Sequence, residues 1–125
     1  MPTPVPTPVS YAALNARDWA LVMKDPGAYI GKALLVWGCI TQFDAATGTA
    51  SFLGRASPAK LTYWYSDGSS TFFNGDKALL APFVKGDVVV MELVVLGPFS
   101  YDTQAGGNTT VPNFKIATIA NKGSC

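Results

Sequence analysis

The chain has 125 residues, with nine lysines and arginines, eight aspartates and glutamates, and no histidine. Apolar residues make up 49% and charged residues 14%, which excludes a disordered chain and indicates one domain with a single core. A net charge of +1 gives no electrostatic footprint for nucleic acid, and the lack of histidine removes the commonest general base and metal ligand.

Residues 1–10 form a Thr/Pro-rich segment ahead of a single predicted domain at residues 11–125. Such a segment prefers extended polyproline geometry and acts as a stiff arm. Three interpretations stay open: a linker from a signal or membrane anchor, an ordinary disordered N-terminus, and an arm that docks on a neighbouring subunit. The sequence shows no signal peptide and no apolar run of the roughly 18 to 20 residues that cross a bilayer.

A helix is predicted after Asn15, whose side chain can cap it, while Asp18 suits the positive end of the helix dipole. Pro26 and Gly27 are expected to stop this helix. Its apolar face is predicted from residues at helical spacing: Ala16, Trp19, Ala20 and Met23.

The rest of the chain favours β-structure. Five strands are predicted, at residues 33–43, 50–56, 61–66, 88–96 and 111–119. Phe72 and Phe73 can continue the sheet, and a short helix is predicted over residues 77–81. The order helix, three strands, short helix, two strands predicts a mainly β fold: a five-stranded OB-type Greek-key barrel, in which closure removes exposed strand edges. A small open sandwich is the alternative.

Several segments resemble a known family. They are residues 25–32 (DPGAYIGK), 36–38 (VWG), 41–48 (TQFDAATG), 84–87 (VKGD) and 100–112 (SYDTQAGGNTTVP). Over residues 11–119 the chain resembles OB-fold domains of the anticodon-binding-like type, most closely domains of actinobacteria and their phages. The resemblance implies a barrel that often follows a membrane anchor and a linker, and it brings no catalytic residues. After Gly38, where the family has a polar residue, this chain has Cys39.

Cys39 and Cys125 allow one disulfide, which would close a long loop. Cys39 lies within a predicted strand and Cys125 is the last residue, so pairing requires the C-terminus to fold back. Two free thiols fit the sequence equally well.

A first candidate binding surface is the predicted strand at residues 61–66. In OB folds the face of strands two and three binds oligonucleotides and oligosaccharides, where aromatic rings can stack on bases or sugars. Alternation forces at least one aromatic ring outward, either to bind a ligand or to be covered by the N-terminal helix or a loop. The candidate residues are Arg55, Lys60, Tyr63, Trp64 and Tyr65.

A second candidate surface is the predicted strand at residues 88–96, which is apolar on both faces and therefore needs cover on both. Its interior side chains are predicted to be Val89, Met91, Leu93 and Val95. The outer face is expected to contact either the N-terminal helix, through Trp19 and Met23, or a partner. The connection over residues 96–112 is long enough to be functional or disordered. Leu96 is expected to point outward as well. The candidate interface residues are Val88, Val90, Glu92, Val94, Phe99 and Tyr101.

No nucleophile–base pair, phosphate loop or metal-ligand spacing is recognisable, so no enzyme activity, cofactor or metal is predicted. The sequence favours a non-enzymatic module that recognises a protein or glycan from the cell envelope, outside the cytoplasm. The alternative is a structural subunit of a phage virion or envelope complex that self-assembles through its apolar strand and N-terminal arm. Single-stranded nucleic-acid binding ranks third.

Overall fold

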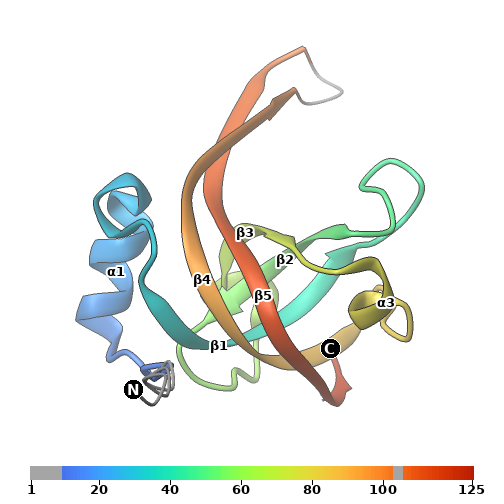
Figure 1. Ribbon diagram of the computed structural model, residues 1–125, viewed down its shortest axis with the longest axis horizontal. Helices are drawn as coiled ribbons and strands as arrows, with labels where there is room; N and C mark the ends of the chain where they lie inside the picture. The colour runs from blue at the N-terminus through green and yellow to red at the C-terminus, as the bar shows by residue number, and fades with distance from the viewer. Residues whose placement is uncertain (1–9, 103–105) are drawn as a thin grey trace, which may run out of the picture.

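Five strands form a closed barrel in the computed structural model, which describes residues 10–102 and 106–125. The strand order is β1-β2-β3-β5-β4, and β4 pairs with β1 to close it. All neighbours are antiparallel except β3 and β5. The strands are β1 (Ala33–Gln42), β2 (Ser51–Ser57), β3 (Ser69–Asn74), β4 (Asp87–Asp102) and β5 (Asn108–Ser124). The predicted OB-type barrel is confirmed (Figure 1).

Four short helical elements accompany the barrel within the described residues. They are α1 (Ala16–Lys24), the 3-10 turn η1 (Pro26–Tyr29), α2 (Trp64–Asp67) and α3 (Lys77–Leu80). The N-terminal helix and the short helix between the third and fourth strands are thus confirmed. No helix among the described residues is long and apolar enough to span a membrane. The Thr/Pro-rich segment at residues 1–10 lies outside the described residues except for Ser10.

Alternating side chains of the strands fill the barrel. Three phenylalanines from β2, β3 and β5 pack in series, with ring centroids 4.9 Å apart for Phe52 and Phe73 and 5.8 Å apart for Phe73 and Phe114. The predicted interior of β4 is confirmed, because its four alternating side chains are fully buried: Val89, Met91, Leu93 and Val95. Their burial supplies much of the hydrophobic free energy that stabilises the fold.

Helix α1 begins at its predicted cap, where the Asn15 Oδ1 atom accepts a hydrogen bond from the Asp18 amide at 2.8 Å. Trp19 and Val22 are buried, and the Trp19 ring lies 6.1 Å from that of Phe114 in the barrel core. The helix therefore packs its apolar face against the barrel core. The predicted face was wrong in part: Ala16 and Ala20 are exposed, because the core contacts the side of the helix that carries Val22.

The predicted third strand at residues 61–66 is wrong. Residues 64–67 instead form the single turn of α2, and the third strand is β3, where only an extension of the sheet was expected. Trp64 explains the difference, because its buried ring packs with Cys39 and Val88 on the outside of the barrel. In the helical turn the Trp64 ring lies against the barrel wall while Tyr63 and Tyr65 stay exposed. A strand would show the same alternation of buried and exposed side chains, so the sequence pattern fits both structures.

The predicted long connection at residues 96–112 is also wrong, because β4 and β5 continue through most of it. Beyond the barrel the two strands form a two-stranded ribbon, here called the arm, which projects at the top of Figure 1. Pro98 and Pro112 lie directly opposite each other in the arm. Proline lacks an N–H group, so it is tolerated where a strand edge faces outward, and it also blocks pairing with another chain.

Candidate ligand-binding groove

A groove of about 650 Å³ lies between the arm and the turn that joins β1 to β2. Its floor is the outer face of β2 and β3, where Leu53 and Phe72 lie opposite each other. The remaining lining residues come from the two walls: Gln42, Ala46 and Thr47 on the turn side, and Phe99, Tyr101 and Asp102 on the arm. This volume falls in the range of typical small-ligand sites, about 300 to 1,000 Å³.

Three aromatic rings form a stacked ladder along the groove. The rings of Phe72 and Phe99 are nearly parallel, at 14°, with centroids 4.3 Å apart. Tyr101 follows Phe99 by two residues on β4, so both rings project from the same face of the strand, with centroids 6.3 Å apart. The ladder fixes the base of the arm against β3, and its three half-buried rings line the groove.

The wall opposite the arm is a turn organised around Asp44. The Asp44 carboxylate accepts hydrogen bonds from the Ala46 amide at 2.9 Å and from the Gln42 side chain at 3.3 Å. The Gln42 bond, followed by that from the Ala46 amide, lowers the pKa of Asp44 below its ordinary value. Gly48 closes the turn with a positive φ of 85°, a conformation that glycine adopts without strain. The turn is therefore held in one shape.

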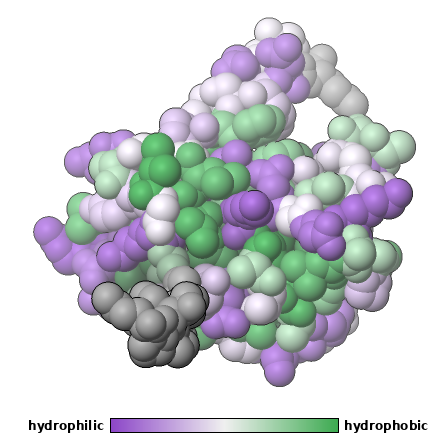
Figure 2. Space-filling model, in the orientation of Figure 1, coloured by the Kyte–Doolittle hydropathy of each residue, from purple (hydrophilic) through white to green (hydrophobic). Residues whose placement is uncertain are grey.

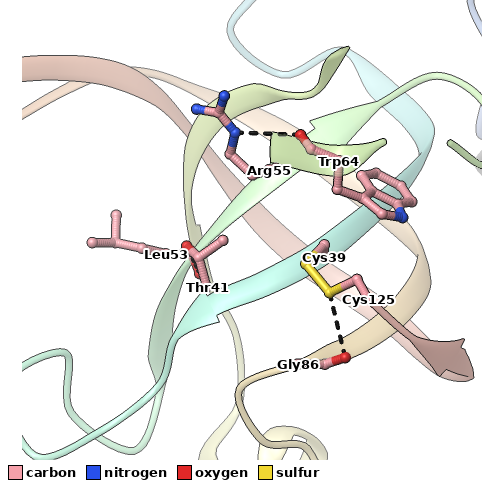
Figure 3. Close-up of a disulfide and its surroundings, with 7 residues drawn as sticks. All are labelled: Cys39, Thr41, Leu53, Arg55, Trp64, Gly86 and Cys125. Carbon is pink, nitrogen blue, oxygen red and sulfur yellow. Dashed lines mark hydrogen bonds between the residues drawn. A yellow bond between two sulfur atoms is a disulfide. The ribbon is translucent and has the colours of Figure 1, made fainter. Parts of the chain in front are cut away.

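The residues of the first predicted binding surface differ in their exposure. Tyr63 and Tyr65 are 69% and 64% exposed, so neither ring is covered, whereas Trp64 is only 4% exposed and cannot contact a ligand. Arg55 donates a hydrogen bond to the Trp64 carbonyl at 3.5 Å (Figure 3). It also donates to the Tyr65 carbonyl at 2.6 Å, and so holds α2 on the barrel. Lys60 is exposed in the segment that precedes α2.

The two cysteines form a disulfide, which answers the question left open by the sequence. Cys39 is buried on β1, and its partner Cys125 is brought back to it by the end of β5. The Cys125 amide donates to the Gly86 carbonyl at 2.8 Å, which fixes the C-terminus beside the start of β4. Figure 3 shows Trp64 beside this disulfide. The bridge therefore underlies the packing of α2.

The predicted interface residues of β4 do not form one surface. Val88 is buried under Trp64 and is not available to a partner. Val90 and Glu92 line a shallow pocket of about 240 Å³, where the Thr118 hydroxyl donates to Glu92 Oε1 at 2.9 Å. No residue of α1 lines this pocket, and Trp19 packs into the barrel core instead. Val94 is half-buried.

Leu96 is exposed on β4, its neighbour Gly97 lies against Ile30, and Figure 2 shows apolar atoms gathered where η1 and β4 meet. Phe99 and Tyr101, predicted as loop residues, are the aromatic wall of the groove. The groove lies on the outer face of β2 and β3, and its floor residues Leu53 and Phe72 were not among the residues predicted from the sequence. Their alternation with buried Phe52 and Phe73 was the available signal.

Among the described residues, no three carboxylates or cysteines gather in a way that could hold a metal ion. The groove lining includes one carboxylate, Asp102, and no lysine or arginine. Comparisons with models of protein families, with curated proteins and with solved structures find no match to this chain. The geometry of the groove therefore carries the functional argument by itself.

Proposed function

We propose that this domain is a non-enzymatic recognition module that binds a glycan in the groove between the arm and the β1–β2 turn. The observation that carries the proposal is the ladder of Phe72, Phe99 and Tyr101 along a groove without a cation. The apolar C–H faces of sugar rings pack on aromatic rings, and the Gln42 amide and the Asp102 carboxylate can bind sugar hydroxyls. OB folds bind oligosaccharides on this face of the barrel.

The lining also favours a glycan over nucleic acid. A single strand of nucleic acid is held by a positively charged groove as well as by stacking, and its affinity comes largely from neutralised phosphates. Asp102 would instead repel a phosphate. The resemblance to OB domains of the anticodon-binding-like type remains part of the proposal, and the strand order supports the barrel that it implies.

The disulfide is compatible with an oxidising compartment outside the cytoplasm, where such bonds persist. We place the module at the cell envelope, where glycans are exposed and where the Thr/Pro segment would serve as its linker.

Isothermal titration with a hexamer of N-acetylglucosamine, a neutral glycan, tests the proposal. Phe99→Ala removes the central ring of the ladder and should weaken binding at least about fivefold, since stacking contributes about 1 to 3 kcal/mol per ring. The matched control is Ile30→Ala, which removes an exposed apolar side chain that is not part of the groove lining. Equal affinities of wild-type protein and Phe99→Ala, with both folded, would refute a glycan site on the ladder.

Exposed apolar side chains support a second function, that of a subunit in an envelope or virion assembly. Ile30 is 65% exposed and lies over Gly97, the chain neighbour of exposed Leu96 on β4. Apolar patches of this kind mark protein interfaces when they are contiguous. Light scattering after size-exclusion chromatography tests this function. Self-association that Ile30→Glu abolishes supports it, and a monomer at high concentration rejects it.

A further inference from the structure

The aromatic groove continues along the barrel beyond its own floor. On the outer face of β2 and β3, the pair next to Leu53 and Phe72 is Arg55 and Ser70. One such step covers two residues, or about 7 Å along the strands. Beyond this pair lies α2, because Arg55 bonds to the Tyr65 carbonyl. The ladder, Arg55 and α2 therefore follow one another on a single face, here called the strip.

The far end of the strip presents two tyrosines on a firmly held backbone. Helix α2 has four residues, too few to be stable alone, so its anchors decide its position. Trp64 anchors it against the disulfide, and Gly68 lets it approach β2 so closely that an added Cβ would lie 2.8 Å from Arg55 Cβ. Exposed tyrosines on a rigid backbone are frequent binding hot spots, because little entropy is lost when they bind.

Arg55 supplies a positive charge in the middle of the strip. Its guanidinium has five N–H donors, of which three bond to the Trp64 carbonyl, the Tyr65 carbonyl and the Ser70 hydroxyl. The other two have no partner among the described residues. A guanidinium with unused donors binds carboxylates well. With one cation, the strip suits a ligand that carries a carboxylate on some of its units better than a ligand that carries a phosphate on every unit.

We propose that the ligand is an extended glycan in which acidic sugars alternate with neutral ones, lying along the strip from the arm to α2. The inference rests on the proposed glycan function and names the class of glycan. A neutral ring contacts the Tyr101 end of the ladder, a carboxylate meets Arg55, and a later ring contacts Tyr65. Short glycans occupy the groove alone, so affinity grows with length until both ends of the strip are filled.

Hyaluronan oligosaccharides, in which N-acetylglucosamine alternates with glucuronic acid, are the probes for this inference. The hexasaccharide should bind about tenfold more tightly than the disaccharide, and about tenfold more tightly than the neutral N-acetylglucosamine hexamer. Tyr65→Ala should weaken the hexasaccharide about fivefold, roughly 1 kcal/mol, and leave the disaccharide unchanged. Tyr65→Phe keeps the ring and should retain wild-type affinity, and the NMR signal of the Trp64 indole N–H reports whether α2 stays in place.

The outcomes separate this inference from the proposed function. If Phe99→Ala weakens glycan binding while Tyr65→Ala has no effect on the hexasaccharide, binding along the strip is refuted and glycan binding in the groove is retained. Equal affinities for the acidic and neutral hexamers overturn the role of Arg55. Absence of binding to every glycan overturns the proposed function itself. Tighter binding of single-stranded oligothymidine than of either glycan would replace both with nucleic-acid recognition.

Discussion

Removal of the disulfide should destabilise the barrel strongly. Cys39 and Cys125 are 86 positions apart, so the bond closes most of the chain into one loop. The loop-entropy model gives about 4.5 kcal/mol for a loop of this size at 25 °C. In Cys125→Ser the buried Cys39 thiol keeps its apolar contacts with Trp64 and Val88, so no cavity offsets or enlarges the effect. We expect the free energy of unfolding to fall by about 3 to 5 kcal/mol.

Urea unfolding followed by circular dichroism measures this loss. Domains of this kind have about 5 to 15 kcal/mol of stability, so the change is a large fraction of the total. Wild-type protein in dithiothreitol should match Cys125→Ser, and dithiothreitol should have no effect on the variant. If reduction lowers the stability of the wild type by less than about 1 kcal/mol, the bridge does not hold the C-terminus as argued.

Three further changes test the packing and the turn. An alanine Cβ at Gly54 would lie 2.8 Å from a carbonyl oxygen of β1, so Gly54→Ala should cost about 1 to 3 kcal/mol in urea unfolding, whereas Gly27→Ala, with ordinary contacts, should cost less than about 1 kcal/mol. Asn15→Ala removes the cap of α1 and should lower the stability by about 1 kcal/mol, measured in the same way. The folded-state pKa of Asp44 is lowered, so its contribution to stability is present above the ordinary carboxyl pKa and is lost as the pH falls through the lowered value. In an NMR titration Gln42→Ala should move that pKa upward, and an unchanged midpoint would reject the hydrogen bond as its cause.

The barrel could be predicted because its strands alternate regularly. In β4 the odd-numbered side chains from Val89 to Val95 are all buried. The strand was predicted correctly although its other face is also apolar. Outside the barrel the prediction failed where one tertiary contact decided the structure. The ring of Trp64 fits a site formed by Cys39 and Val88, residues distant in the sequence, and this contact favours a helical turn over a strand.

The arm was mistaken for a loop because glycine and proline usually mark turns. Gly97, Pro98 and Pro112 nevertheless lie within paired strands, where the two prolines face each other across the ribbon. The stacking of Phe99 on Phe72 holds the ribbon, and no local pattern reveals a contact between residues 27 positions apart. The general OB plan therefore drew attention to strands two and three, while the residues that line the groove required the structure.

The most direct test of the account is a map of backbone amide shifts in the NMR spectrum during titration with the hyaluronan hexasaccharide. We predict changes that follow the strip, at Tyr101, Phe99, Phe72, Arg55 and Tyr65, while α1 and the shallow pocket beside Glu92 stay unchanged. Shifts confined to α1 or to that pocket, or a spectrum that saturating glycan does not alter, would contradict recognition through the arm and the outer face of β2 and β3.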